Sequence, residues 1–160
     1  MKNILFILSI FFVTISYSQL KLDSKKTITD GTPVFLKYVD ATITPPKGYV
    51  FLEEYTSFLN EITQSSISVV RDTAVSYNMM VEDLLGRDYE RSKVKLIEEK
   101  KMKDGHFFVL LFQINNQPVE RILYIVGDGE EALYAMANYK QAEKEKYYPV
   151  LLESILSIKY

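Results

Sequence analysis

The stretch from Lys93 to Asn138 constrains the fold most, because three turn signals divide it into four apolar runs. The turn signals are Asp104-Gly105, Asn115-Asn116 and Gly127-Asp128-Gly129. Asp-Gly and Asn-rich pairs supply the positive φ angles that tight hairpins need. The spacing predicts a meander of antiparallel strands over 93–102, 106–114, 118–126 and 131–138.

The middle strands of this meander are predicted to be buried on both faces. Residues 106–112 and 122–126 are apolar without alternation, so the sheet needs a covering layer on each side. The first strand instead alternates, with Val94 and Leu96 on one face. Its other face is expected to be exposed to water and to consist of Lys93, Lys95, Glu99, Lys101 and Lys103.

Two amphipathic segments are predicted to supply the covering helices. The first follows an N-cap at Asp72-Thr73, ends at Gly86, and has apolar residues at helical spacing. Those residues are Tyr77, Met80, Val81, Leu84 and Leu85. In the second, Pro149 would cost about 3 kcal/mol in a helix interior but little in the first turn. The closing helix is therefore predicted to begin near Tyr148.

The part of the chain before the meander is predicted to add short strands and a processed leader. Strands are expected within 34–44, at 49–52 and at 66–71, with Phe58 and Leu59 in a polar connector. Residues 19–33 read as a flexible lead segment. The globular domain is then expected to be a single unit over 34–160, a normal size for one core.

Residues 1–18 have the pattern of a secretory signal peptide. Lys2 precedes a short apolar run, and Ser16 and Ser18 are small residues at the −3 and −1 positions of a cleavage site. The run is short for an anchor, so no stable membrane span is expected after cleavage, although an uncleaved anchor is the alternative. We predict a secreted or periplasmic protein.

Composition narrows the partners and the chemistry further. The chain has no Cys, which excludes disulfides and attachment of lipid to a Cys after the leader. Its formal charge is −2, and loss of Lys2 makes the mature protein more negative. No global basic field exists to attract nucleic acid.

Several short stretches together resemble the PsbP-like superfamily, which includes PsbP, Mog and DcrB-type α/β/α sandwich proteins. These stretches are Thr-Pro-Pro-Lys-Gly-Tyr (44–49), Ser-Ile-Ser-Val (66–69), the hairpin Leu-Tyr-Ile-Val-Gly-Asp-Gly-Glu-Glu-Ala-Leu-Tyr (123–134) and Leu-Leu-Glu-Ser-Ile-Leu-Ser-Ile (151–158). The resemblance spans about residues 40–158. It implies an α+β fold, an antiparallel sheet with a C-terminal meander flanked by helices, in a family whose members mostly bind other proteins without catalysis. It carries no functional residue over to this chain.

No catalytic, cofactor or metal site emerges from the sequence. His106 is the only histidine and has no other His or Cys to share a metal, so a surface or hairpin-end role is expected. Asp128, Glu130 and Glu131 lack the ligand spacing of a calcium loop and are expected in a solvated turn. No cofactor is predicted.

The basic residues Lys93, Lys95, Lys101 and Lys103 are the one charge feature that could bind a partner. Lysines on an edge strand usually discourage aggregation, and an anion-binding patch is the competing interpretation. No other binding residues are predicted.

The leading hypothesis is a non-enzymatic protein-binding domain whose partner is another envelope or secreted protein. Its oligomeric state is left open. One alternative is a small hydrolase, for which Glu53 with Glu54 or Glu98 with Glu99 are the nearest carboxylate pairs, although neighbours on a strand point to opposite faces. Another is a carrier of a small apolar ligand, whose cavity would be lined by Phe107, Val109, Tyr124 and Met80.

Overall fold

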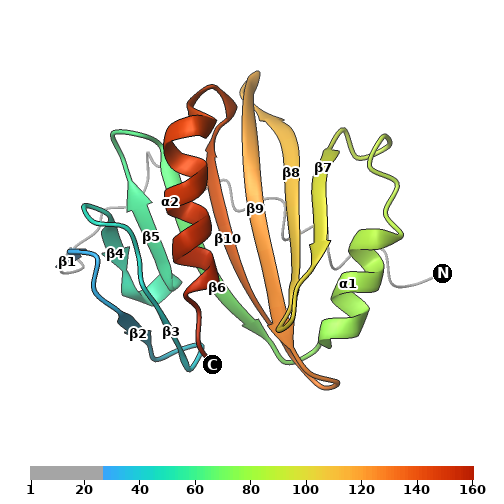
Figure 1. The fold of residues 1–160 in the computed structure, drawn as a ribbon, viewed down its shortest axis with the longest axis horizontal. Helices are drawn as coiled ribbons and strands as arrows, with labels where there is room; N and C mark the ends of the chain where they lie inside the picture. Colours follow the sequence, from blue (N-terminus) through green and yellow to red (C-terminus); the bar gives the residue numbers. More distant parts are fainter. Residues whose placement is uncertain (1–26) are drawn as a thin grey trace.

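The structure is a computed structural model, and it describes residues 27–160. An eight-stranded antiparallel sheet forms its centre, with strand order β1-β4-β5-β6-β10-β9-β8-β7 (Figure 1). The strands of this sheet are β1 (Thr27–Ile28), β4 (Val50–Leu52), β5 (Ser57–Asn60), β6 (Ser65–Asp72), β7 (Lys95–Lys101), β8 (His106–Ile114), β9 (Gln117–Gly127) and β10 (Ala132–Lys140). The remaining elements are the hairpin β2 (Val34–Leu36) and β3 (Ala41–Ile43), the helices α1 (Tyr77–Leu85) and α2 (Lys144–Leu156), and the 3-10 turns η2 (Glu53–Tyr55) and η3 (Gln141–Glu143).

The predicted meander is confirmed as β7 to β10, which pair in sequence order. Asn115 and Asn116 have the expected positive φ, 50° and 62°, and Gly127 has φ of 143°, whereas neither Asp104 nor Gly105 has a positive φ. β10 then pairs with β6, so the meander joins strands from the first half of the chain. The most apolar strands, β8, β9 and β10, therefore lie inside the sheet and not at its ends.

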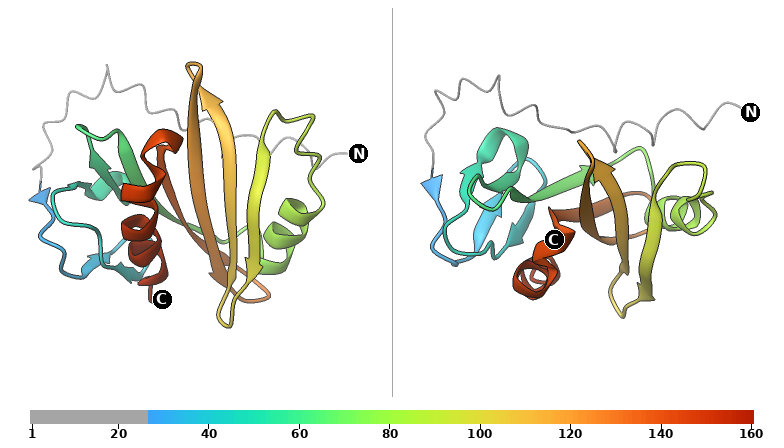
Figure 2. Two further views of the ribbon diagram at one scale, coloured as in Figure 1. Left: turned by 45° about the horizontal axis from the view of Figure 1, so that its top comes forward. Right: turned by 90° about the horizontal axis from the view of Figure 1, so that it is seen from above.

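Two layers cover the sheet, one on each face, as the apolar strands require. α2 and the β2–β3 hairpin lie over one face, and α1 lies over the other (Figures 1 and 2). On the α2 face, Leu151 and Ile155 pack into a cluster with Phe58, Ile67 and Val109. Further members of that cluster come from the hairpin: Leu36, Val39, Ala41 and Ile43.

The smaller cluster on the opposite face joins α1 to the meander. Met80, Val81 and Leu84 contact residues of β8, β9 and β10 at the same apolar spacing that the sequence predicts. Its sheet members are Phe108, Leu123, Ile125, Ala132, Tyr134 and Met136. Alternation along each strand assigns its residues to one cluster or the other, so this sheet has two separate cores.

Three predictions for the N-terminal half are wrong. Phe58 and Leu59 are not in a polar connector but in β5, with 0% and 7% of their surface exposed. The 34–44 stretch forms two strands rather than one, because the chain reverses near Asp40, whose φ is 44°. Thr27 and Ile28 pair with β4, so the folded part extends ahead of the predicted boundary at residue 34. The predicted signal peptide lies outside the described residues.

Both helices begin at other residues than predicted. Ser76 caps α1, and its hydroxyl accepts a hydrogen bond from the Met79 backbone N–H at 3.4 Å, so the predicted cap at Asp72-Thr73 is wrong. α2 begins at Lys144 and contains Pro149 in its interior, so the predicted start near Tyr148 is also wrong. A 3-10 turn leads directly into this earlier start.

Gly105 provides a test of the packing at the β7–β8 turn. A Cβ there would lie 2.4 Å from the Ile125 carbonyl oxygen, which is backbone and cannot move aside. We expect Gly105→Ala to lower the free energy of unfolding by about 1–3 kcal/mol, measured by urea denaturation. The matched control is Gly129→Ala, where a Cβ meets no atom within 4 Å. That change should stay within about 0.5 kcal/mol, and equal losses for both variants would contradict this account.

Candidate functional site

The lysines singled out in the sequence lie on or beside β7, the terminal strand of the described sheet. Lys95 and Lys101 belong to the strand, whereas Lys93 precedes it and Lys103 lies in the following turn. All four are exposed. Whether they bind an anion stays a prediction, but their geometry differs from the single row that the sequence suggested.

A bulge divides this basic row between the two faces of the sheet. The register of β7 against β8 shifts between Leu96 and Glu98. Lys95 is opposite Leu111 and so points to the α2 face, whereas Lys101 is opposite His106 and points to the α1 face. The prediction that Lys95 and Lys101 share a face is therefore wrong, because one extra residue in a strand reverses every side chain beyond it.

His106 lies at the hairpin end, as predicted, but it is not on the surface. Only 5% of the residue is exposed, and its ring stacks on Phe108 with 4.8 Å between centroids. Its Nε2 contacts the Glu99 carboxylate on β7. The pair ties the terminal strand to β8 on the α1 face.

At alternate residues of β7, the backbone N–H and C=O groups point away from β8 and form no hydrogen bond with it. The Met102 N–H donates to the Gly105 carbonyl at 2.9 Å, so these two residues form a hydrogen-bonded pair at the turn. Such pairs alternate with non-hydrogen-bonded ones in antiparallel strands. The next pair, Lys101 with His106, therefore directs the Lys101 N–H and C=O away from β8, and Glu99 two residues earlier is oriented in the same way.

Two buried charged residues lie next to each other on β9, and the sequence reading missed both as functional candidates. Glu120 faces α2 and is 1% exposed, whereas Arg121 faces the opposite side and is 8% exposed. The sequence feature that could have indicated them is a pair of charged residues inside a central strand that is otherwise apolar. Because neighbouring residues alternate across a strand, the pair places one charge in each layer.

Glu120 is held by groups from β10 and α2. The Tyr139 hydroxyl donates to its Oε2 at 2.5 Å, and the Lys144 Nζ lies 2.9 Å from the same oxygen. Burial and this hydrogen bond raise the pKa of Tyr139 well above its usual value. Nearby, the Tyr148 hydroxyl donates to Glu98 Oε2 on β7 at 3.4 Å. These five polar side chains join α2 to three strands of the meander.

Arg121 is packed among polar and aromatic groups on the other face. Its Nε donates to Asn138 Oδ1 at 2.8 Å, and the Asn138 amide donates to the Ser66 hydroxyl at 3.2 Å. The guanidinium carbon lies 5.0 Å from the centre of the Phe112 ring. Burial lowers the pKa of Arg121 to about 10.

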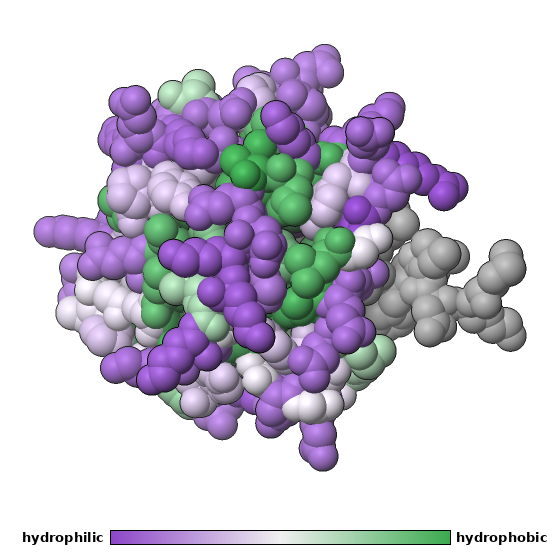
Figure 3. Space-filling view, turned by 45° about the vertical axis from the view of Figure 1, so that its right-hand side comes forward, coloured by the Kyte–Doolittle hydropathy of each residue, from purple (hydrophilic) through white to green (hydrophobic). Residues whose placement is uncertain are grey.

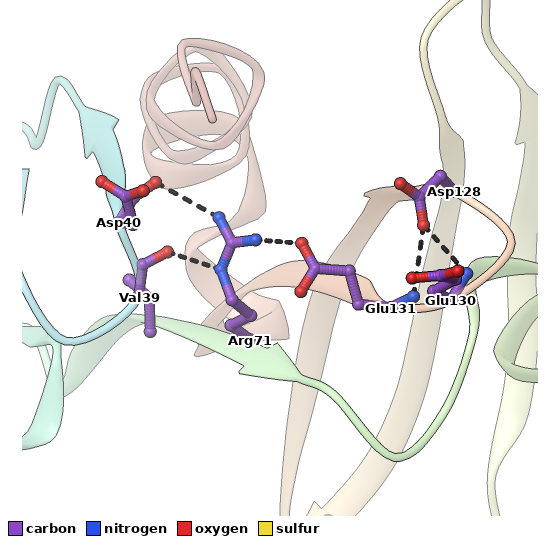
Figure 4. A network of polar contacts seen from close by, with 6 residues as sticks. All are labelled: Val39, Asp40, Arg71, Asp128, Glu130 and Glu131. Atoms are coloured by element: carbon purple, nitrogen blue, oxygen red, sulfur yellow. Dashed lines mark hydrogen bonds and ion pairs between the residues drawn. The ribbon is translucent and has the colours of Figure 1, made fainter.

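Arg71 joins three parts of the chain at one end of the sheet (Figure 4). Its Nε donates to the Val39 carbonyl at 2.8 Å, and a terminal nitrogen donates to the Asp40 carbonyl at 3.2 Å. Its other terminal nitrogen forms an ion pair with Glu131 after the β9–β10 turn. These contacts fix the β2–β3 hairpin against β6.

Of the two carboxylate pairs from the sequence, Glu53 and Glu54 lie in the turn η2 and not on a strand, and Glu53 pairs with Lys37 at 2.8 Å. The other pair does not converge. Glu98 and Glu99 are opposite Val109 and Phe108, so they point to different faces. In the β9–β10 turn, Asp128 accepts hydrogen bonds from the following backbone N–H groups, as expected of a solvated turn. Within residues 27–160, no three His, Asp or Glu side chains are grouped so that they could hold a metal ion.

The predicted lining of an apolar cavity is also wrong. Phe107, Val109 and Tyr124 belong to the cluster beneath α2, whereas Met80 belongs to the cluster beneath α1. The sheet separates them, so they do not line one space.

The side of the molecule that carries α1 and β7 has a mixed surface. Figure 3 shows hydrophobic patches between charged side chains there. The exposed apolar side chains on these two elements are Met79, Leu85 and Ile97. Met79 was expected on or beside the packing face of the helix, and 57% of it is exposed.

The architecture is that of a PsbP-like α+β sandwich, and comparison with solved structures confirms this resemblance at the level of the fold. The chain resembles the solution structure of cyanobacterial PsbP from Synechocystis, with a TM-score of 0.51 and 9% identity, over 86% of this chain and 98% of that one. It also resembles LpqN from Mycobacterium tuberculosis, described as involved in cell envelope biogenesis (TM-score 0.42, 8% identity, 84% and 90% covered). A third match is a protein of unknown function from Pseudomonas aeruginosa (TM-score 0.47, 12% identity, 57% and 69% covered). The sequence matches no protein-family model and no curated protein.

Neither helix among residues 27–160 is long and apolar enough to cross a membrane. Both instead bury one side against the sheet.

The Arg71 contacts predict a stability effect. Arg71→Met keeps the aliphatic stem but leaves the Val39 carbonyl and the Glu131 carboxylate without this donor. We expect the free energy of unfolding to fall by about 1–3 kcal/mol in urea denaturation. Arg91→Met, at an exposed position, is the control and should change it by less than about 0.5 kcal/mol. If both variants match the parent protein, the Arg71 contacts do not stabilise the fold.

Tyr134 predicts how stability depends on alkaline pH. Burial raises its pKa from 10.0 to about 12, so the unfolded chain loses this proton first. Between these pH values the unfolded state binds fewer protons, and stability falls as pH rises. In Tyr134→Phe, the unfolding free energy should fall less steeply with pH, by the slope that corresponds to about one proton. The slope would be measured by denaturation at several pH values. Burial lowers the pKa of Arg121, so this residue makes stability rise with pH in the parent protein and in the Tyr134→Phe variant alike. An unchanged slope would contradict the prediction.

Proposed function

We propose that this protein is a secreted or periplasmic, non-enzymatic binding domain whose partner is another envelope or secreted protein. The partner adds an extended segment to the open edge of β7. The observation that carries this proposal is the edge itself, a seven-residue strand that is exposed at every position except Leu96 and ends the described sheet. An open edge of this kind recognises a peptide through backbone hydrogen bonds, and neighbouring side chains provide specificity.

The regular part of β7 carries two acidic and two basic side chains, Glu98, Glu99, Lys100 and Lys101. Opposite charges across antiparallel strands stabilise the pairing, and like charges destabilise it. A partner segment that places an opposite charge across from each of these side chains is therefore favoured at this edge.

Two further observations support the binding role and the location. Glu98 and Glu99 point to different faces of the sheet, and His106 and Glu120 pair with neighbouring side chains, which supports a binding role over hydrolysis. The first residues of the sequence, Lys2 followed by an apolar run and small residues, have the pattern of a secretory leader.

Substitution of Lys101 by proline tests strand addition without disturbing the fold. The Lys101 N–H points outward, so Lys101→Pro should leave the β7–β8 pairing intact and remove a donor that an added strand would use. We expect binding of the partner captured by the mature protein from a native envelope extract to weaken by about tenfold or more. Binding would be measured as retention on immobilised protein and then as affinity for the isolated partner.

Two variants control this experiment. Lys101→Ala keeps the N–H and removes the charge, so it should retain binding unless the lysine itself is recognised. Lys100→Pro removes an N–H directed toward Phe107 and should lower stability. Binding that survives Lys101→Pro unchanged, or a mature protein that captures nothing at any salt concentration, would overturn the proposal.

A further inference from the structure

The first half of α2 is anchored differently from the second half. Pro149 lies inside the helix and has no N–H, so the Glu145 carbonyl loses its helical partner. All the buried residues of α2 come after this point: Leu151, Ser154 and Ile155. The proline therefore divides the helix where its hydrophobic anchoring begins.

The second half is fixed by apolar packing and by hydrogen bonds to Thr44, the residue that follows β3. Leu151 and Ile155 are fully buried in the main core. The Ser154 hydroxyl donates to the Thr44 carbonyl at 2.8 Å, and the Thr44 N–H donates to the Ser157 hydroxyl at 2.8 Å. This half cannot leave the sheet without opening the core.

The first half has no buried residue and is held by polar contacts and by Tyr147 and Tyr148, which pack against the main core but are only partly buried. Lys144 pairs with buried Glu120, and its Nζ lies 5.3 Å from the centre of the Tyr148 ring. Tyr148 is half-buried and reaches Glu98 across the sheet on β7. Glu143, which precedes the helix, does not cap it with its side chain, and its Oε2 is buried without a hydrogen-bond partner among residues 27–160. A buried oxygen without a partner favours states in which water reaches it.

We propose that residues 141–148 form a strap that swings about Pro149 while the second half of α2 stays in place. Opening separates Lys144 from Glu120 and Tyr148 from Glu98, and it uncovers the sheet between α2 and β7. The residues uncovered include Val109, which is opposite both Glu98 and Ile122 on this face. The strap is thus a gate over an apolar surface beside the strand edge, and its motion does not depend on the binding partner proposed above.

Thiol labelling tests the strap, because the chain has no Cys and one substitution gives a unique reactive group. Val109→Cys places it beneath the strap, and Val126→Cys places the same side chain on the same face away from Glu98. These valines are 0% and 2% exposed. Under native conditions, with iodoacetamide in excess, we expect the thiol at 109 to react about tenfold or more faster than the thiol at 126.

Two second-site changes distinguish strap opening from global unfolding. Glu120→Gln removes the charge that holds Lys144, and it should accelerate labelling at 109 by about threefold or more while leaving 126 unchanged. Pro149→Ala restores the helical N–H and should slow labelling at 109 only. Ile122→Cys, in the same cross-strand row, replaces Val109→Cys if that variant does not fold. Equal labelling at both positions, or equal responses to Glu120→Gln, would overturn the proposal.

Discussion

The fold depends on burying both faces of β8, β9 and β10. Their side chains are apolar above and below the sheet, so one helix would leave half of them in water. The chain meets this requirement with α1 on one face and with α2 and the β2–β3 hairpin on the other. The short N-terminal strands extend the sheet, whereas the hairpin leaves it and completes a covering layer. This division explains why two separate cores form around one sheet.

A sheet that is buried on both faces accommodates few charged side chains. The buried charged residues of this sheet lie where its layers or strands are joined. Glu120 and Arg121 are adjacent on β9, and each is buried on a different face. Glu120 connects the sheet to α2 through Lys144, and Arg121 connects β9 to β10 through Asn138. A buried carboxylate needs such partners, because its desolvation is otherwise costly. The contacts of these two residues join the layers and strands of the fold.

Local patterns in the sequence predicted the meander and both helices, but not the features set by distant contacts. Asp-Gly and Asn-Asn are local turn signals, so the hairpins could be predicted directly, and Asn115 and Asn116 have the positive φ that such turns need. Phe58 and Leu59 become strand residues only because β6 lies beside them. α2 begins before Pro149, and its first residue, Lys144, contacts Glu120, a strand residue distant in sequence. The bulge at Leu96 was likewise invisible to a period-two pattern, and it separated the predicted basic face.

The division between covered faces and an open edge also limits how this domain can bind another molecule. The buried parts of both sheet faces carry a core layer, so a partner that used those parts would have to displace a helix or the hairpin. The β7 edge needs no such displacement, since its outward backbone groups at Glu99 and Lys101 are not used by β8. Tyr148 links this edge to the first half of α2 through Glu98. A segment added at the edge would therefore lie beside the part of α2 that has the fewest apolar anchors.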